Sequence, residues 1–273
     1  MKSPPAARKA AGVASEFERR AARAELLAGK AETAREPLRF AAGLYRAQGR
    51  LAEHLESAHA ESPLSGHLDA DIPRFLEPAA GIVGFAAQSG PEALAEIARA
   101  RQSDLAATSR TRLLVYWSGD ATSRDDYLSR AILRPYVELL RVAVVPPDRL
   151  HRRGQCPFCG GSPWVSARRE GSLTEGARRS LVCALCGGEW HFSRILCPAC
   201  FEEDPRKLPS YTTERHPAVR VEACETCRKY VKSIDLSEDA RPIPEVDELA
   251  SLALDLWAHE EGFERIEPGI AGV

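Results

Sequence analysis

The stretch from residue 156 to residue 227 contains all eight cysteines of the chain, in four pairs that each enclose two residues. The pairs are Cys156-Pro-Phe-Cys159, Cys183-Ala-Leu-Cys186, Cys197-Pro-Ala-Cys200 and Cys224-Glu-Thr-Cys227. An interval of 23 residues separates the first pair from the second and again the third from the fourth, whereas 10 residues separate the second from the third. The stretch is therefore an internal repeat with a period of 41 residues, and each copy supplies four thiols.

This spacing is typical of metal ligation. Two residues between cysteines allow a tight turn, here called a knuckle, that brings both sulfurs to one ion at about 2.3 Å for zinc, and a second knuckle completes the tetrahedron. We predict two metal ions in tetrahedral four-cysteine sites. Iron and zinc both accept four thiolates, so the spacing leaves the metal open. The predicted ligands are Cys156, Cys159, Cys183 and Cys186 for the first site and Cys197, Cys200, Cys224 and Cys227 for the second.

Other uses of paired cysteines fit this stretch less well. A thioredoxin-type dithiol should open a helix within a strand–helix–strand unit. Covalent haem needs a histidine after the pair, and the residues there are Gly160, Gly187, Phe201 and Arg228. A nested or cross-braced pairing of the eight cysteines stays open, although the exact repeat favours tandem sites.

The residues around the knuckles differ between the two copies. Gly160 and Gly187 stand where a positive φ is useful, but the second copy has Phe201 and Arg228 there, so we expect its site to be less regular. Trp190 and His191 follow a knuckle closely and could line a metal site or hydrogen-bond to its ligands; a surface position is the alternative.

The composition changes along the chain and predicts an α+β multidomain protein. We predict a mostly helical N-terminal domain, two tandem rubredoxin-like or zinc-ribbon metal modules, and a C-terminal helix. The predicted boundaries are a loose head over 1–14, a helical domain over 15–147, modules over 151–194 and 195–236, and an acidic helix and tail over 237–273.

Local signals place several elements. Proline in the first turn and acidic residues near it are typical of helix starts. One helix is expected from Glu36-Pro37 through Leu55, and another from near Ser123 through Leu140 with a kink at Pro135. A helix that starts at Gly90-Pro91-Glu92 should have one face formed by Leu94, Ile97, Ala98 and Leu105. A helix from Pro244 to Gly262 should bury Val246, Leu249, Leu252, Leu256 and Trp257. Strands are expected over 178–182, 189–192, 218–222 and 230–234.

The charge balance excludes some function classes. The 273 residues carry 37 basic and 39 acidic side chains, so a dedicated nucleic-acid binder is not expected. Residues 151–234 carry 14 basic and 9 acidic side chains, and residues 235–273 carry 2 and 11. Arginines such as Arg168 and Arg179 are expected on a solvated surface. Neither a membrane span nor a signal peptide is evident, which predicts a cytoplasmic protein without membrane insertion.

Six segments together resemble the formate dehydrogenase accessory protein family, FdhE. The resemblance is dense from about 154 to 265, whereas the N-terminal region is similar only in character and length. One departure is the tail Glu267-Pro268-Gly269-Ile270, where an Asn-Pro ending is expected. The segments are Cys-Pro-Phe-Cys-Gly-Gly-Ser-Pro (156–163), Val-Cys-Ala-Leu-Cys-Gly-Gly-Glu-Trp-His (182–191), Arg-Ile-Leu-Cys-Pro-Ala-Cys (194–200), Glu-Ala-Cys-Glu-Thr-Cys-Arg-Lys-Tyr-Val-Lys (222–232), Asp-Glu-Leu-Ala-Ser-Leu-Ala-Leu-Asp-Leu (247–256) and Glu-Glu-Gly-Phe (260–263).

The resemblance implies a cytoplasmic maturation factor that is not an enzyme. Members of the family bind iron through their cysteines and contact the catalytic subunit of respiratory formate dehydrogenases before its export by the twin-arginine pathway. Two rival classes are a zinc-ribbon adaptor for nucleic acid or another protein, and an iron-based redox protein. Oligomeric state and the partner-binding surface are not readable from the sequence.

Overall fold

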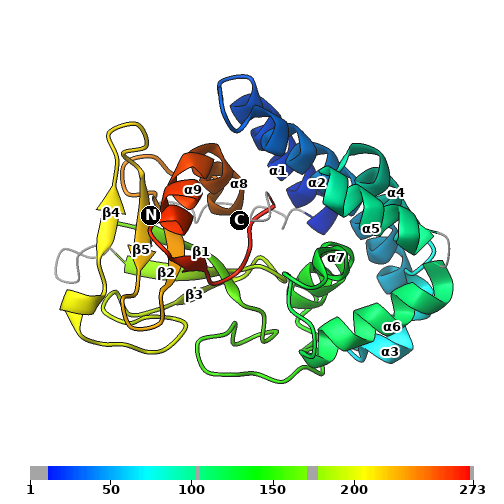
Figure 1. The fold of residues 1–273 in the computed structure, drawn as a ribbon. Coiled ribbons are helices and arrows are strands. Elements are labelled where there is room, and N and C mark those ends of the chain that lie inside the picture. Colours follow the sequence, from blue (N-terminus) through cyan, green and yellow to red (C-terminus); the bar gives the residue numbers. More distant parts are fainter. Residues whose placement is uncertain (1–11, 103–104, 171–177, 271–273) are drawn as a thin grey trace, which may run out of the picture.

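The fold is taken from a computed structural model that describes residues 12–102, 105–170 and 178–270. Figure 1 shows the helices of the first half on one side of the molecule, the strands with the C-terminal helices on the other, and the last residues running between the two sides. No helix among these residues is both long and apolar enough to cross a bilayer. The helices of the first half are α1 Val13–Ala28, α2 Arg35–Glu61, α3 Leu68–Asp71, α4 Ala80–Ser89, α5 Glu92–Gln102, α6 Leu105–Ser118 and α7 Tyr127–Val142, with a 3-10 turn at Ile72–Arg74.

The helical half is built on the pairing of α1 with α2. Small buried residues such as Ala21 and Ala41 let these helices approach closely, and the rings of Phe17 and Tyr45 meet at 6.4 Å between centroids. The expected helix start at Glu36-Pro37 is confirmed within one residue. The loose head expected over 1–14 falls mainly on residues outside the described part, and α1 already begins at Val13.

Two expectations for this half are wrong in detail. The helix expected from near Ser123 begins at Tyr127, because Asp126 caps it by accepting a hydrogen bond from the Ser129 amide at 3.0 Å. In α5, Ile97 is 51% exposed, and the buried face is formed by Ala95, Ala98 and Arg101. Leu105 lies in the next helix.

The cysteine-rich half forms one seven-stranded mixed sheet in the order β3-β2-β1-β6-β5-β4, with β7 beside β6. Parallel pairing of β1 with β6 joins the two copies, so the two modules share one sheet. The expected strands are confirmed, and β1, β4 and β7 are additional. The bounds are β1 Pro163–Arg169, β2 Arg178–Cys183, β3 Glu189–His191, β4 Ser210–Thr212, β5 Val219–Ala223, β6 Lys229–Asp235 and β7 Glu264–Arg265, with a 3-10 turn at Pro205–Lys207.

The helix expected from Pro244 to Gly262 is divided into three pieces. These are α8 Pro244–Asp247, a 3-10 turn Glu248–Ser251 and α9 Leu252–Glu260, and the chain leaves α9 through Gly262 at φ +79° as expected. The expected buried stripe is partly wrong. Leu256 is 51% exposed, while Leu254 and Ala258 pack with the sheet.

The acidic C-terminal segment buries much of its charge. Glu248 and Asp255 form ion pairs with Lys232 of β6 and with Arg265, all four side chains being at most 2% exposed. Although burial disfavours the charged carboxylate, Arg265 and Lys232 hold the pKa of Glu248 below its usual range. Burial of single charges is costly, so these pairs fix how the segment lies on the sheet.

Candidate metal centres

The structure brings the eight cysteines together in two groups of four. Site one holds Cys156, Cys159, Cys183 and Cys186, site two holds Cys197, Cys200, Cys224 and Cys227, and the sulfurs of each group lie within 4.8 Å of one another. Cross-knuckle Sγ–Sγ distances are 3.6 and 3.5 Å in site one and 3.7 and 3.6 Å in site two. A tetrahedron with metal–sulfur bonds of about 2.3 Å has sulfurs roughly 3.8 Å apart, so both groups are suited to one tetrahedral ion.

The grouping follows the tandem arrangement of the sequence repeat. Each group joins the four cysteines of one repeat copy, and no described cysteine is shared between the groups. The nested pairing left open by the spacing is therefore not the one that the fold builds.

All four knuckles have the same backbone hydrogen bonds. The amide of the residue after the second cysteine donates to the carbonyl of the first, at 2.9 Å for Gly160, 3.1 Å for Gly187, 3.0 Å for Phe201 and 2.9 Å for Arg228. The amide of each first cysteine donates in turn to the carbonyl two residues beyond the second cysteine, at 2.9 to 3.0 Å. Amides of Cys186, Gly188 and Ala199 also point at sulfurs at 3.4 Å, where they can disperse thiolate charge.

The expectation that site two is less regular is wrong for the backbone. Phe201 and Arg228 have φ values of +64° and +55°, close to the +65° and +62° of Gly160 and Gly187. Their surroundings explain why side chains are possible there. The Phe201 ring lies 4.0 Å from the Arg153 guanidinium, and the Arg228 guanidinium lies 3.8 Å from the Phe263 ring centroid.

The glycines of site one, in contrast, have little space for a side chain. A Cβ on Gly160 would lie 2.4 Å from the Leu150 carbonyl oxygen, so the backbone would have to shift. A Cβ on Gly187 would lie 3.1 Å from Arg20 and 3.2 Å from Glu138, both in the helical half, and these side chains would have to move. The helical domain therefore packs directly on the second knuckle, where glycine allows the approach.

Burial is the main difference between the sites. All four cysteines of site one are buried and belong to the large core cluster that they share with α1, α2 and α7. In site two, Cys200 is exposed and Cys227 is half-buried. Burial and the neighbouring sulfurs raise the pKa of Cys183 well above its usual value. Four thiolates in that position therefore require a cation to balance them.

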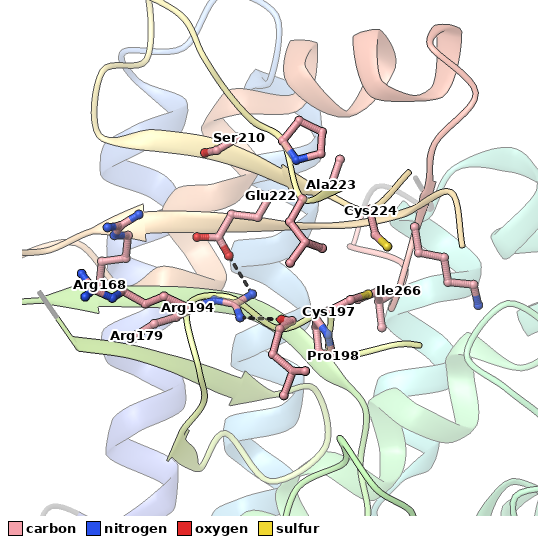
Figure 2. A pocket seen from close by; sticks show the side chains of 14 residues that line it. Arg168, Arg179, Arg194, Cys197, Pro198, Ser210, Glu222, Ala223, Cys224 and Ile266 are labelled. Carbon is pink, nitrogen blue, oxygen red and sulfur yellow. Dashed lines mark hydrogen bonds and ion pairs between the residues drawn. The ribbon is translucent and has the colours of Figure 1, made fainter. Parts of the chain in front are cut away.

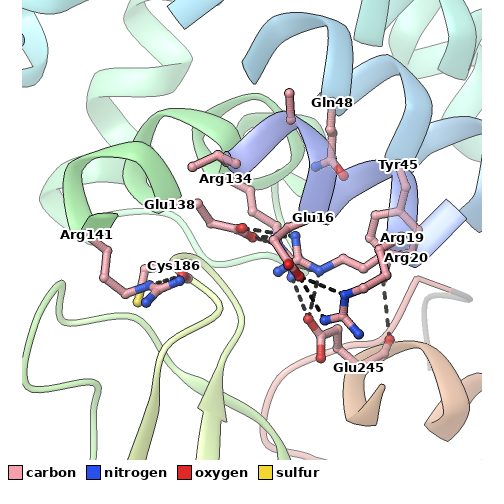
Figure 3. A network of polar contacts seen from close by, with 12 residues as sticks. Glu16, Arg19, Arg20, Tyr45, Gln48, Arg134, Glu138, Arg141, Cys186 and Glu245 are labelled. Atoms are coloured by element: carbon pink, nitrogen blue, oxygen red, sulfur yellow. Dashed lines mark hydrogen bonds and ion pairs between the residues drawn. The ribbon is translucent and has the colours of Figure 1, made fainter. Parts of the chain in front are cut away.

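A buried ion-pair network beside site one joins α1 to α7 and α8 (Figure 3). Arg20 of α1 binds Glu138 of α7 and Glu245 of α8, each at 2.9 Å, and Arg134 binds the same two carboxylates at 2.7 and 3.3 Å. Next to this network, Arg141 donates to the Cys186 carbonyl at 2.9 Å. The second knuckle of site one is thus clamped by the helical half.

Site two has a smaller polar support of its own. The Glu202 carboxylate accepts a hydrogen bond from the Thr226 hydroxyl at 2.5 Å, joining one knuckle to the other. The hydrogen bond from Thr226 lowers the pKa of Glu202 to about 2.

Other side chains singled out in the sequence lie as follows. Trp190 is half-buried and packs against the large core, while His191 is exposed at the edge strand β3. Within the described residues neither side chain hydrogen-bonds to a cysteine. Arg179 is 4% exposed, so its expected solvated position is wrong. It pairs with Glu222 of the other module at 2.7 Å and donates to the Ser193 carbonyl of its own module at 2.9 Å.

Sequence reasoning missed the residues that hold the two halves together. Arg20 and Glu245 are 225 positions apart, so no local pattern couples them. The tail that departs from the expected Asn-Pro ending also has a clear place. Glu267 is buried against Arg130 at 2.6 Å, and the Pro268 carbonyl accepts from the same guanidinium at 2.8 Å.

A helical domain joined to a sheet that carries two four-cysteine groups defines a class of proteins with paired, rubredoxin-like metal-binding sites. Residues 155–194 match the family described as FdhE, central domain, and residues 195–270 match FdhE, C-terminal domain. These matches span residues 155 to 270 and confirm the resemblance to the FdhE family seen in the sequence.

Individual relatives agree with this assignment. The chain is 33% identical over 120 residues to an FdhE homologue of Aquifex aeolicus, covering 44% of this chain and 42% of that protein. It is 37% identical over 120 residues to an FdhE homologue of Pseudomonas putida, covering 42% and 37%. The matched region thus spans about two fifths of the length of these curated relatives.

The fold as a whole resembles a solved structure. The crystal structure of the FdhE protein from Pseudomonas aeruginosa superposes with a TM-score of 0.68, at 24% identity, over 94% of this chain and 95% of that chain. The helical half, which no matching family model covers, therefore has the same overall fold.

Proposed function

We propose that this chain is a cytoplasmic accessory factor, not an enzyme, that assists maturation of a respiratory formate dehydrogenase by binding its catalytic subunit before export. The observation that carries the proposal is that the FdhE central and C-terminal domains coincide with the two four-cysteine groups. The division into a helical domain over 15–147, modules over 151–194 and 195–236, and a C-terminal part over 237–273 belongs to the same proposal.

The metal part of the proposal rests on the donor set. Cys156, Cys159, Cys183 and Cys186 would hold one ion, and Cys197, Cys200, Cys224 and Cys227 the other. A bound ion would offset part of the negative charge of the thiolates and fix the knuckles; iron would in addition supply one-electron chemistry. Four protein sulfurs fill a tetrahedron and leave no open position for substrate, which favours a non-catalytic role.

Complementation tests the proposal. A host that lacks its own FdhE protein receives the wild-type chain, the C183S/C186S variant, the C224S/C227S variant, or the matched control T226S, which changes a knuckle without removing a thiol. We expect the wild type and T226S to restore formate dehydrogenase activity and the cysteine variants to fail. The tagged wild type should also capture the catalytic subunit with its twin-arginine leader attached. Capture of only the mature, exported form would contradict the proposal.

An iron-based redox role is a second candidate, favoured by the exposure of Cys200 in site two. Zinc-loaded protein separates the two roles. If the metal only holds the knuckles, the zinc form restores full activity. If iron chemistry is needed, the zinc form stays folded and captures the subunit but yields no active enzyme.

A further inference from the structure

A small pocket lies where the two modules meet, beside site two. It has a volume of about 100 Å³ and is lined from both modules: β1 and β2 supply Arg168 and Arg179, and the second module supplies Glu222, Cys197 and Cys224. Because one liquid water occupies about 30 Å³, the pocket has room for a group the size of a carboxylate or phosphate. Figure 2 shows these side chains.

The lining is strongly cationic. Four basic side chains, Arg168, Arg179, Arg194 and Lys229, face one carboxylate, Glu222, which already pairs with Arg179 at 2.7 Å. Arg179 is largely satisfied, since it also donates to the Ser193 and Leu196 carbonyls. Among the described residues, neither Arg168 nor Arg194 has a side-chain ion pair.

Buried polar atoms without hydrogen-bond partners lie in the pocket and next to it. In the described part of the chain these are Nε of Arg168 and Oε2 of Glu222, which line the pocket, and Nε of Arg220, which lies outside the lining. Arg168 and Arg220 lie on one face of the sheet, because Arg220 is in register with Ser233, and Ser233 with Ser166, two residues from Arg168. Burial, and then the charge of Arg220, lower the pKa of Arg168. Unsatisfied buried donors are rare and call for an explanation.

We propose that this pocket binds a small oxyanion, a carboxylate or phosphate group held by Arg168 and Arg194 beside the Arg179–Glu222 pair. Bidentate donors and net positive charge are what such groups require. The oxyanion can be a free ion or an acidic side chain of a protein partner, and the experiment below separates these sources.

The positive charge of the basic side chains in the pocket exceeds the negative charge of the neighbouring metal site. Four cations against one carboxylate leave three positive charges, and a divalent ion in four thiolates contributes two negative ones, so one positive charge remains. In Figure 2 the side chains of Arg168 and Cys224 also lie at opposite ends of the group. The Arg168 guanidinium is thus at the end remote from this sulfur, which leaves it available to an anion.

Calorimetric titration of the metal-loaded full chain at low ionic strength tests the proposal. The probes are inorganic phosphate, acetate and a neutral-ended peptide with one aspartate. We expect one saturable site for at least one probe, with binding weakened tenfold or more in R168Q and in R194Q. The matched control R206Q removes an arginine of the second module that is 89% exposed and should bind like the wild type. Preference for a free ion or for the peptide identifies the source.

Metal content, measured on the same samples, guards against a structural explanation. Arg194 is exposed, so R194Q should fold and keep both metals even if R168Q does not. Absence of saturable binding for every probe would overturn the proposal. Equal weakening of anion binding in R206Q and R194Q would overturn it as well, because arginine charge would then act by general screening. Loss of metal from R194Q with anion binding retained would also overturn it, because Arg194 would then act on the thiolates.

Discussion

Site one and site two share their knuckle geometry but differ in what surrounds them. Site one is enclosed by the helical half, which presses Arg20 and Glu138 against Gly187 and anchors Arg141 to Cys186. Site two includes the turn between β5 and β6, with Cys200 exposed and Cys227 half-buried. The repeat therefore provides two metal-binding units of equivalent geometry. Because of their different burial, site one connects the sheet to the helical half, whereas site two is accessible to solvent.

The largest expected effect comes from removing one site at a time. The C183S/C186S and C224S/C227S variants should each lose half of the bound metal, because no cysteine is shared. Structural metal binding is worth about 10–16 kcal/mol, comparable with the whole stability of a domain. Since site one lies in the large core, C183S/C186S should also destabilise the helices, whereas C224S/C227S should leave them folded.

Elemental analysis and thermal unfolding followed by circular dichroism measure these two outcomes. Loss of both metals from either variant would show that the sites are not independent. If the helices melted at the same temperature in the two variants, site one would not stabilise the helical half more than site two does.

The next largest effect tests the clamp, by which we mean the buried ion-pair network of Arg20, Arg134, Glu138 and Glu245 beside site one. Glu245 is the carboxylate of α8 that binds both Arg20 and Arg134 in the core. E245Q keeps the shape but leaves two guanidiniums to share Glu138, which should cost about 3–5 kcal/mol. The control is E25Q, which breaks the half-exposed Arg46–Glu25 pair and should lower the stability far less, because ion pairs in contact with water contribute little. Urea unfolding of metal-loaded protein measures both, and similar losses would disprove the clamp.

Acid should weaken the same clamp. Burial opposes ionisation of Glu245, but Arg20 and Arg134 outweigh it and hold its pKa below the usual range. A lowered folded pKa means that its stabilisation is complete above the unfolded value of about 4.3 and is lost as pH falls below it. One such carboxylate contributes at most about 1.4 kcal/mol per pH unit. Because acid also releases metal, the free energy of unfolding of wild type and E245Q is measured against pH at one metal concentration. The free energy should fall less steeply with decreasing pH in E245Q. Equal slopes in the two proteins would show that Glu245 does not contribute to the acid sensitivity.

Metal release to a chelator compares the two centres directly. We expect two phases of equal amplitude, with site two at least tenfold faster because the chelator can reach Cys200 without opening the core. C224S/C227S should abolish the fast phase alone. A single phase in the wild type, or loss of the slow phase in that variant, would show that burial does not control exchange.

The sequence predicts these features to the extent that they are local. Cysteine spacing, the proline at 37 and the glycine at 262 act within a few residues, so both metal groups and several element ends can be read directly. Strand β1 was missed because it is buried along most of its length as an inner strand of the sheet, which removes the alternating pattern that marks half-exposed strands.

Long-range charge pairing is what the sequence does not reveal. The composition describes residues 235–273 simply as acidic, yet Glu245, Glu248 and Glu267 are each buried against cations from distant elements. Arg179 looks like one of several surface arginines until Glu222 of β5 and the loop after Phe192 enclose it. Such pairs depend on which elements become neighbours, and that is decided by packing of the whole chain.

The smallest expected effect concerns the residue that closes each knuckle. In site two, F201G removes a side chain from a left-handed backbone, which relieves about 1–2 kcal/mol. It also loses the stacking of Arg153 on the ring, worth roughly 0.5–1 kcal/mol, and adds glycine's entropy cost of about 0.5–1 kcal/mol. The net change should lie within about 1 kcal/mol of zero.

In site one, G187A places a Cβ at φ +62° against Arg20 and Glu138, which should cost about 1–3 kcal/mol and speed metal release from site one. Chemical unfolding and chelator kinetics on the two variants measure the difference. If F201G were the more harmful change, packing of the helical half would not be the reason that site one has glycines.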